Sequence, residues 1–486
     1  MHILDLTISE IHRALVNKEI TPRELVDEAF RRLESDANNL FETSMKEQTY
    51  KRLATLGEPE KDNVFWGIPF MIKDNFSTKG VLTTASSDIL NGYIPVFDAT
   101  VVKKLYQAKA LPIAKATMDE LAMGGSGVTG HKGPTFNPYD IKHEHIIGGS
   151  SSGSAAAVAA GIVPFALGSD TGDSVRKPAS HGGLVGFKAT WGRISRYGLF
   201  PFVPSLDHVG YFTRSVEDAA HALNLLSGYD KMDTTSSIKP VENYVKKIHD
   251  GIENARIAVL NQVYSSITDA AVRHAFDHLV ENVKAKGIIV DFVDIDETLM
   301  RAIYPTYIVL SCAEATSNNA NLDGIRFGQR KDGETYQDIM TNSRTAGFSP
   351  LIKRRFLIGS FALMRENQFE LYQRAQKARR LIVDAVNKIF DNYDAILLPA
   401  APSVAPKFNA DSDALSDEYL IADNHLAIGN FGGFPSLTLP LGFKDNLPFG
   451  VNVTGRPYAD ADVLAIAYQL ENIIGYRNLS TRRMKQ

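Results

Sequence analysis

Residues 152–170, SGSAAAVAAGIVPFALGSD, predict the class of fold. Small residues fill the first half of this stretch and Gly161 ends it, which is typical of a short helix closed by a glycine. The apolar run that follows has the length of a buried β-strand and is bounded by turn residues. A helix that leads directly into a strand is the repeating unit of α/β proteins, so we expect a fold of this class.

The same alternation continues on both sides of this stretch. Upstream, VFWGIPFMIKDN (64–75) predicts a short strand that ends at Lys73, and ATVVKKLYQAKALPIAKAT (99–117) predicts a helix and then a strand. Downstream, residues 216–300 predict helix, strand, helix and strand in turn. Residues 300–390 are mostly helical in pattern, and the last hundred residues predict strands and a closing helix.

The chain shows no internal repeat and no low-complexity linker. Residues 1–60 predict an N-terminal helical segment, in which Thr21-Pro22-Arg23-Glu24 has the pattern of a helix start. We therefore expect a single domain over 1–486. Its core, 64–215, would carry the chemistry, and 216–486 would complete the sheet and supply the substrate pocket.

The composition is that of an ordinary globular protein. Apolar residues make up 44% of the 486 residues and charged residues 22%, with a net charge of −4. This balance offers no broad basic surface, so nucleic-acid binding is not expected as the main activity. The single cysteine, Cys312, excludes an internal disulfide and a cysteine-based zinc cluster, and it fits a reducing compartment.

The sequence gives no sign of export or of a membrane span. Asp5 and Glu10 interrupt the first apolar stretch, where a signal peptide needs an uncharged core. The longest run of small apolar residues, 155–168, is broken by Pro164 and falls short of the ~20 residues of a membrane helix. We expect a cytoplasmic protein that does not contact membranes.

Ser174 is the candidate nucleophile in the polar turn GSDTGDSVRKPAS (168–180). A serine needs a base to take its proton, and Ser174 lies three residues before Lys177 in the S-x-x-K pattern of some acyl enzymes. Pro178 disfavours helical geometry at Lys177, and the S-D-N and K-T-G motifs that accompany this pattern do not occur in the sequence. This arrangement is therefore a weak candidate.

A second serine pattern is G-x-S-x-G over residues 149–153, with Ser151 as the nucleophile. This motif requires a strand that runs into the turn, but the preceding YDIKHEHIIGG is polar and only weakly strand-like. The Gly-Lys-Ser/Thr sequence of a phosphate-binding loop does not follow either.

Three segments taken together are more specific. Lys73 in IPFMIKDN, Ser150 in GGSSSGS and Ser174 in GSDTGDS occur in this order, with ALGSDTG and GLVGFKATWGRISRYG beside them. These segments, and the spacing from Ser150 to Ser174, resemble the amidase signature family over nearly the whole chain. The resemblance implies a single large α/β/α domain with a mixed central sheet covered by helices.

The resemblance also implies a Lys–Ser–Ser triad. Ser174 would be the nucleophile, Ser150 the proton relay and Lys73 the base. A lysine acts as a base only when neutral, so its usual pKa of about 10.4 must be lowered, and the apolar IPFMI run could supply the burial. The resemblance places the oxyanion hole at four successive backbone N–H groups, those of Thr171, Gly172, Asp173 and Ser174. Asp170 and Arg176 would hold this turn.

Within the family, four further segments resemble the glutaminase subunits of tRNA-dependent amidotransferases. They are MDELAMGG, GPTFNPYD, RYGLFPFVPSLDHVG and AEATSNNANLDGIRFG. By this resemblance Asp423 would bind the α-ammonium of glutamine and Tyr307 would line the pocket. An arginine in IKRRFLIGSFAL would bind the α-carboxylate, with Arg354 as the first choice and Arg355 as the second.

The resemblance implies no cofactor in this chain. Ammonia would pass to a partner B subunit that acts as kinase and transamidase, using ATP and Mg²⁺ to amidate Glu-tRNA(Gln) or Asp-tRNA(Asn). A small C subunit would bridge the two, and the tRNA would be held mainly by the partner. The family usually has glycine where Asp173 and Ser152 stand. A stand-alone amidase of other specificity and a non-catalytic scaffold therefore remain as alternatives.

Two expectations concern geometry. An unpaired carboxylate ~5 Å from the oxyanion would cost about 3 kcal/mol, so the Asp173 side chain should point away from the hole, toward Lys177 or another cation. By resemblance the Gly149–Ser150 peptide should be cis. Lys73 should lie within about 3.2 Å of Ser150, and Ser150 within about 3.2 Å of Ser174, or somewhat farther without ligand.

Overall fold

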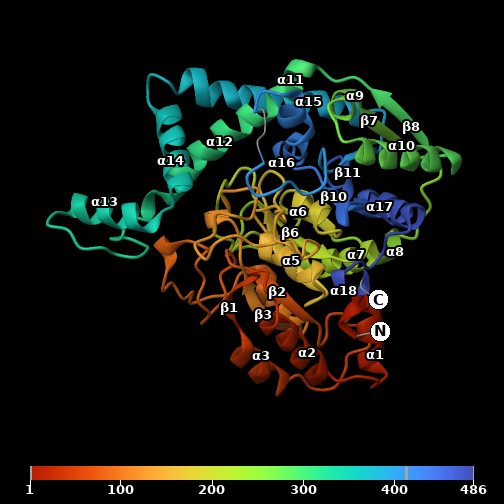
Figure 1. The fold of residues 1–486 in the computed structure, drawn as a ribbon, viewed down its shortest axis with the longest axis horizontal. Coiled ribbons are helices and arrows are strands. Elements are labelled where there is room, and N and C mark those ends of the chain that lie inside the picture. The colour runs from red at the N-terminus through yellow and green to blue at the C-terminus, as the bar shows by residue number, and fades with distance from the viewer. Residues whose placement is uncertain (1–2, 411–413, 485–486) are drawn as a thin grey trace.

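A single mixed β-sheet runs through the molecule in the computed structural model, which describes residues 3–410 and 414–484 (Figure 1). Its eleven strands lie in the order β1-β3-β2-β4-β6-β5-β10-β11-β9-β7-β8. The strands are β1 (Phe41–Ser44), β2 (Pro69–Lys73), β3 (Leu111–Ala116), β4 (Phe165–Asp170), β5 (Val185–Lys188), β6 (His208–Thr213), β7 (Arg256–Leu260), β8 (Ile289–Val293), β9 (Ala395–Pro399), β10 (Ser436–Lys444) and β11 (Leu447–Gly455).

The strand directions bring the predicted chemistry to one edge of the sheet. Strand β2 is parallel to both β3 and β4, and Ile72 pairs with Leu167. Because parallel strands end at the same edge, Lys73 at the end of β2 lies beside Ser169 and Asp170 at the end of β4. Strand β7 is parallel to β8 and β9, and the other pairs are antiparallel.

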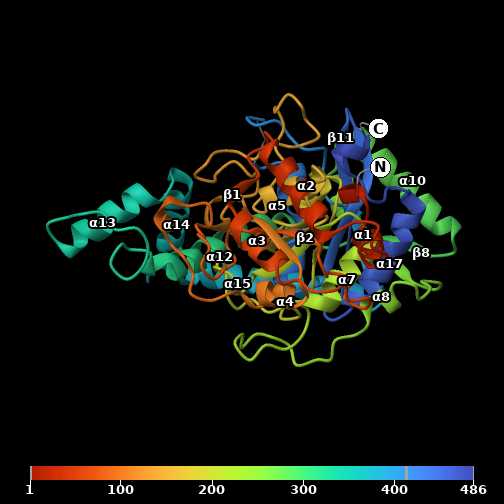
Figure 2. The same ribbon diagram turned by 90° about the horizontal axis from the view of Figure 1, so that it is seen from below.

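Helices flank the sheet. They are α1 (Ile8–Val16), α2 (Pro22–Glu34), α3 (Lys46–Leu53), α4 (Thr100–Gln107), α5 (Ser152–Ala159), α6 (Arg176–His181), α7 (Val216–Leu226), α8 (Tyr244–Lys247), α9 (Asn261–Ser265), α10 (Ala270–Ala285), α11 (Glu297–Arg301), α12 (Ile303–Asn318), α13 (Tyr336–Gly347), α14 (Pro350–Leu363), α15 (Arg374–Phe390), α16 (Ile428–Phe431), α17 (Asp460–Ile474) and α18 (Thr481–Met484). Helix α13 projects from the body in both views, and α14 packs against α12 (Figures 1 and 2).

The small residues of α5 allow it to approach the sheet closely. Every residue from Ser152 to Ala159 is buried, and a Cβ on Gly153 would collide with the carbonyl oxygen of Leu40. Helix α5 contacts β4 and β2, so this packing fixes the start of the helix next to the strand ends that carry Lys73 and Ser169. The helix and strand predicted over 152–170 are confirmed.

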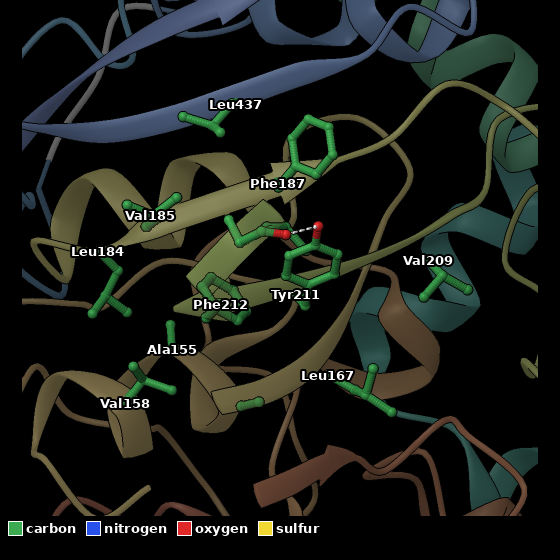
Figure 3. Packing of buried hydrophobic residues seen from close by; sticks show 14 of the residues in the cluster. Ala155, Val158, Leu167, Leu184, Val185, Phe187, Val209, Tyr211, Phe212 and Leu437 are labelled. Carbon is green, nitrogen blue, oxygen red and sulfur yellow. Dashed lines mark hydrogen bonds between the residues drawn. The ribbon is translucent and has the colours of Figure 1, made fainter. Parts of the chain in front are cut away.

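The core continues through the middle of the sheet. Figure 3 shows Val185 and Phe187 of β5, Tyr211 and Phe212 of β6 and Leu437 of β10 among its buried side chains. The Tyr211 hydroxyl is fully buried and donates a 2.8 Å hydrogen bond to the carbonyl oxygen of Ala219, which satisfies its polar atom inside the core.

The N-terminal segment confirms one prediction and corrects another. Thr21 caps α2 as predicted, with its side chain accepting from Glu24 N and the Glu24 side chain accepting from Thr21 N. Residues 41–44, however, form strand β1 inside the segment predicted as helical. The two ends of the described chain lie side by side, where Asn478 Nδ2 donates to the carbonyl oxygen of Asp5 (Figures 1 and 2).

Across residues 3–410 and 414–484, no helix has both the length and the apolar character that crossing a bilayer requires.

Candidate active site

Lys73 is the centre of a buried cluster of hydroxyl groups. Its Nζ donates to Ser150 Oγ at 2.8 Å, to Ser151 Oγ at 2.9 Å and to Ser169 Oγ at 2.9 Å. The side chain is 0% exposed, and within the described residues it forms no ion pair. Burial without a contacting carboxylate lowers the pKa of Lys73 to about 7, so a large share of the amine is neutral at neutral pH.

Ser150 and Ser174 are held by their backbones. The Gly149–Ser150 peptide is cis, as predicted, and the carbonyl oxygen of Ser150 accepts from Asp119 N at 3.1 Å. The next residue, Ser151, donates its N–H to the carbonyl oxygen of Ser174 at 3.2 Å. In the described part of the chain no hydrogen bond joins the Ser150 and Ser174 hydroxyls. The expected first contact, Lys73 to Ser150, is therefore present, and the second is not formed in this conformation.

The turn from Thr171 to Ser174 has four successive backbone N–H groups. No hydrogen bond engages these four groups within the described residues, so none of them is committed to an acceptor in that part of the chain. Such a set of oriented N–H groups can stabilise a developing oxyanion. Tyr307 packs against the turn so closely that a Cβ on Gly172 would lie 3.0 Å from its ring.

Asp170 and Arg176 hold this turn in place through buried hydrogen bonds. Arg176 Nη2 donates to Asp170 Oδ1 at 2.8 Å and to the carbonyl oxygen of Gly172 at 2.8 Å. Burial alone would raise the pKa of Asp170, but the Arg176 guanidinium holds it well below its usual range. Asn430 completes the network, because its Oδ1 accepts from Arg176 Nη2 and its Nδ2 donates to Asp170 Oδ1.

Asp173 has the predicted orientation. Its Oδ2 lies 2.8 Å from Lys177 Nζ, so the carboxylate is paired with a cation. Its φ is not positive, so aspartate fits the backbone here without strain. Lys177 also lies 3.1 Å from Asp423 Oδ1.

The structure corrects the argument made from Pro178, because Lys177 belongs to α6. A proline is tolerated in the first turn of a helix, where N–H groups have no intrahelical acceptor. The S-x-x-K pattern still supplies no base. Although burial acts in the opposite direction, Asp173 and Asp423 raise the pKa of Lys177, and its ammonium stays charged.

A cavity of about 900 Å³ opens beside this turn, and its lining includes Asp173, Lys177, Tyr307, Arg355 and Asp423. Three of the four predicted pocket residues, Tyr307, Arg355 and Asp423, are thus brought together from segments far apart in the sequence.

Arg354, the first choice for the carboxylate, does not line this cavity and is exposed, whereas its neighbour Arg355 lines the cavity and is partly buried. Successive residues of a helix point about 100° apart, so only one of the two can face the pocket. Of the two arginines, Arg355 is therefore the one that faces the cavity.

The contacts of three residues of the site were not predicted. Ser151 and Ser169 supply two of the three hydroxyls around Lys73, and Ser151 Oγ donates in turn to the carbonyl oxygen of Ser169. The buried Asp119 carboxylate accepts from the backbone N–H groups of residues 127–129, which orders the loop beside the cavity. The parallel pairing of β2 and β4 places Ser169 next to Lys73, and a sequence pattern does not reveal strand pairing.

The chain belongs to the amidase family, since the family model named Amidase matches residues 24–464. The membership of this family that the Lys73, Ser150 and Ser174 segments predicted is confirmed. Among curated proteins, the chain is 38% identical to the A subunit of glutamyl-tRNA(Gln) amidotransferase from Halothermothrix orenii, over 100% of both chains. This relative belongs to the branch of the family that the four further segments predicted.

Solved structures agree with this placement. The crystal structure of the A subunit of glutamyl-tRNA(Gln) amidotransferase from Thermotoga maritima matches with a TM-score of 0.76 and 36% identity, covering 97% of this chain and 95% of that one. A chain from a vestigial protein complex, connected with the origins of an s-triazine catabolic enzyme, matches with a TM-score of 0.81 and 30% identity. That match covers 98% of this chain and 100% of the other. The predicted α/β fold with a mixed sheet flanked by helices is confirmed.

Proposed function

We propose that this chain hydrolyses the side-chain amide of glutamine through an ester on Ser174, as the glutaminase subunit of a tRNA-dependent amidotransferase. The observation that carries the proposal is the buried amine of Lys73, which contacts Ser150 at 2.8 Å and has a pKa lowered to about 7. A neutral amine in this position can accept the proton that a serine nucleophile must lose.

In the first half of the reaction the Ser174 hydroxyl attacks the amide carbon. Its proton passes to Ser150 as Ser150 gives its own proton to Lys73. The carbonyl electrons move onto oxygen, where the N–H groups of residues 171–174 stabilise the negative charge. Collapse of this intermediate breaks the C–N bond, and the proton held by Lys73 returns through Ser150 to the leaving nitrogen. The products are ammonia and a γ-glutamyl ester of Ser174.

In the second half, water attacks the ester through the same groups. The water gives its proton along the Ser150 and Lys73 chain, and the C–O bond to Ser174 breaks. The proton returns to Ser174 Oγ, and glutamate leaves. The chain's own residues supply every proton transfer, and no cofactor takes part.

The pocket offers groups for both charges of glutamine. Arg355 Nε and Nη1 are buried and have no hydrogen-bond partner in the described part of the chain, so this guanidinium can bind the α-carboxylate. Asp423, whose side chain is 33% exposed, lines the same cavity and would bind the α-ammonium. Tyr307, which packs against Gly172 and lines the same cavity as Arg355, would close the pocket around the glutamine side chain.

The amidotransferase assignment is supported by the full-length similarity to relatives that are named as A subunits of glutamyl-tRNA(Gln) amidotransferase. We propose that the chain acts in the cytoplasm, together with a B subunit that uses ATP and Mg²⁺ and with a small C subunit. The ammonia released at Ser174 would pass to the B subunit, which would hold the tRNA.

The central experiment is interception of the ester. With glutamine and hydroxylamine, the chain should form γ-glutamyl hydroxamate, alone or with its B and C subunits, and S174A should form none. Glutamine turnover by S174A at the rate of the unchanged protein would overturn the serine mechanism. Hydrolysis of simple amides but never of glutamine would favour the stand-alone amidase, and no acyl enzyme with any amide would favour the scaffold.

The two neighbouring arginines give a matched pair of variants on one helix. R355M should raise the KM for glutamine at least tenfold, because a charged hydrogen-bond partner of the carboxylate is lost. R354M, which removes an equal charge from the exposed face of α14, should leave KM unchanged. Equal effects of the two substitutions would show that Arg355 does not bind the substrate.

A further inference from the structure

The ammonium end of the pocket already holds a cation that belongs to the chain itself. Lys177 Nζ lies 2.8 Å from Asp173 Oδ2, 3.1 Å from Asp423 Oδ1 and 2.7 Å from the carbonyl oxygen of Asp423. An ammonium group donates in three directions, and these three acceptors use all of them. The Lys177 side chain is only 9% exposed, so it is fixed in this position rather than solvated.

Asp173 and Lys177 belong together as a unit. They are four residues apart, and the backbone of α6 carries Lys177 back over Asp173, where Lys177 N donates to the carbonyl oxygen of Asp173 at 2.9 Å. Asp173 thereby anchors the Lys177 ammonium from one side while Asp423 binds it from the other.

This contact changes what Asp423 can offer to a substrate. Its Oδ1 and its carbonyl oxygen are both engaged by Lys177, and Oδ2 alone has no hydrogen bond within residues 3–410 and 414–484. A substrate ammonium bound at Oδ2 would approach the Lys177 ammonium, and like charges at such a distance repel. Arg355, at the carboxylate end, has no comparable competitor because its Nε and Nη1 are unpaired in the described structure.

We propose that Lys177 is a specificity-determining residue, a tethered ammonium that stands where the α-ammonium of glutamine would bind. The inference rests on the proposed function, because it takes Ser174 as the nucleophile and Asp423 as the ammonium partner. The substrate class that fits is an ω-amide that carries a carboxylate but no α-ammonium. The pocket therefore accepts 4-carbamoylbutanoate, which is glutamine without its amino group, at least as well as glutamine.

The test compares these two amides in the unchanged protein and in D173G/K177Q. This double variant removes one carboxylate and one ammonium together, so the net charge is unchanged and Asp423 loses its internal cation. We expect the ratio of kcat/KM for glutamine to kcat/KM for 4-carbamoylbutanoate to be near one or below in the unchanged protein. In the double variant the ratio should rise about tenfold, mainly through a lower KM for glutamine.

A matched control is E47Q/K51Q, which removes a glutamate–lysine pair with the same four-residue spacing from α3. Both of its side chains are about three-quarters exposed, and the pair lies outside the cavity lining. The substrate ratio should be unchanged in this variant. If the glycine in D173G/K177Q prevents folding, D173N/K177M keeps the backbone as it is, and the same rise in the ratio is expected.

The failures of the two proposals are distinguishable. An unchanged ratio in a folded double variant, with glutamine still hydrolysed at Ser174, would overturn the role of Lys177 alone. If neither amide is hydrolysed even with the B and C subunits present, the proposed function fails. Calorimetric titration of both ligands into S174A and S174A/D173G/K177Q then measures affinity without turnover. If S174A/D173G/K177Q does not bind glutamine more tightly, relative to 4-carbamoylbutanoate, than S174A does, the inference is overturned by the binding measurement as well.

Discussion

Lys73 and Lys177 are both almost completely buried near the Ser174 turn, and their surroundings are opposite. Three serine hydroxyls surround Lys73, whereas two carboxylates surround Lys177. Desolvation disfavours the ammonium in both places, but only Lys177 has contacting negative charges that reverse this effect. The pKa of Lys73 is therefore lowered and that of Lys177 is raised.

The difference shows how one residue type can serve two purposes within a single site. Neutral hydroxyls can exchange protons with an amine, so the surroundings of Lys73 suit proton transfer. The carboxylates around Lys177 accept its hydrogen bonds and keep it charged, so it can act only as a fixed cation. Burial alone would not have distinguished the two lysines, since their partners decide the outcome.

The largest expected effect is on catalysis. K73M should lower kcat for amide hydrolysis by about 10³–10⁴-fold, because the proton of Ser174 then has no base. K177M should lower it by less than tenfold. Initial rates of ammonia release measure both. K73R is the sharper control, since a guanidinium keeps the charge but does not deprotonate, and recovery of activity in K73R would exclude proton transfer through this position.

The second effect is on the pH dependence. The proposed mechanism requires the Lys73 amine in its neutral form, and the pKa of this amine is about 7. The value of kcat/KM should therefore be constant well above pH 7 and fall about tenfold per unit below it. Lys177 should add no further change between pH 5 and 9, because its pKa is raised. A flat profile from pH 5 to 8 would show that Lys73 is not the base.

The third effect is on stability. K177M leaves two partly buried carboxylates without their cation, so the free energy of unfolding at pH 7 should fall by about 1–2 kcal/mol. Urea denaturation followed by circular dichroism measures this change. The surface lysine in K51M has one exposed partner, Glu47, and its loss should leave the free energy of unfolding unchanged within the error of the measurement. A loss in K177M no larger than in K51M would mean that the buried pairs do not stabilise the site.

The smallest expected effect is a gain in stability, in contrast to the loss expected for K177M. K73M should raise the free energy of unfolding at pH 6 by about 1 kcal/mol, because it removes a buried charge that has no ion-pair partner. The folded pKa of Lys73 lies below its unfolded value of about 10.5, so its destabilising effect is fully present below pH 7 and disappears as pH rises through 10.5. The gain in K73M should shrink over the same range. If K73M instead lowered the free energy of unfolding at pH 6, the Lys73 ammonium would not be destabilising, and the contrast with Lys177 would fail.

Local patterns in the sequence predicted much of the fold. The helix and strand of residues 152–170, the strand that ends at Lys73 and the capping box at Thr21 all occur where expected, because each depends on neighbouring residues. Strand β1 was missed, since it has only four residues and depends on pairing with β3. The division of the chain into an N-terminal segment, a core and a remainder stays a prediction.

The site was predictable to the extent that it follows a motif. The positions of Lys73, Ser150 and Ser174 came from the resemblance, and their catalytic roles remain a proposal. The choice between Arg354 and Arg355 depends on how α14 is rotated by its packing, which no local pattern encodes. The contact of Lys177 with Asp423 joins residues 246 positions apart, so only the folded chain reveals it.

The hydrogen bonds of Arg176 that support the Ser174 turn also determine when the site can form during synthesis of the chain. Arg176 reaches its acceptor on Asn430 across 254 residues of chain. A ribosome adds about 5–20 residues per second, so the turn leaves the tunnel about 10–50 s before the segment that braces it. During that interval Asp423 is also missing, so the nascent chain carries Ser174, the proposed nucleophile, without a finished pocket. Activity can begin only after the C-terminal strands have joined the sheet, which makes the enzyme silent until synthesis is nearly complete.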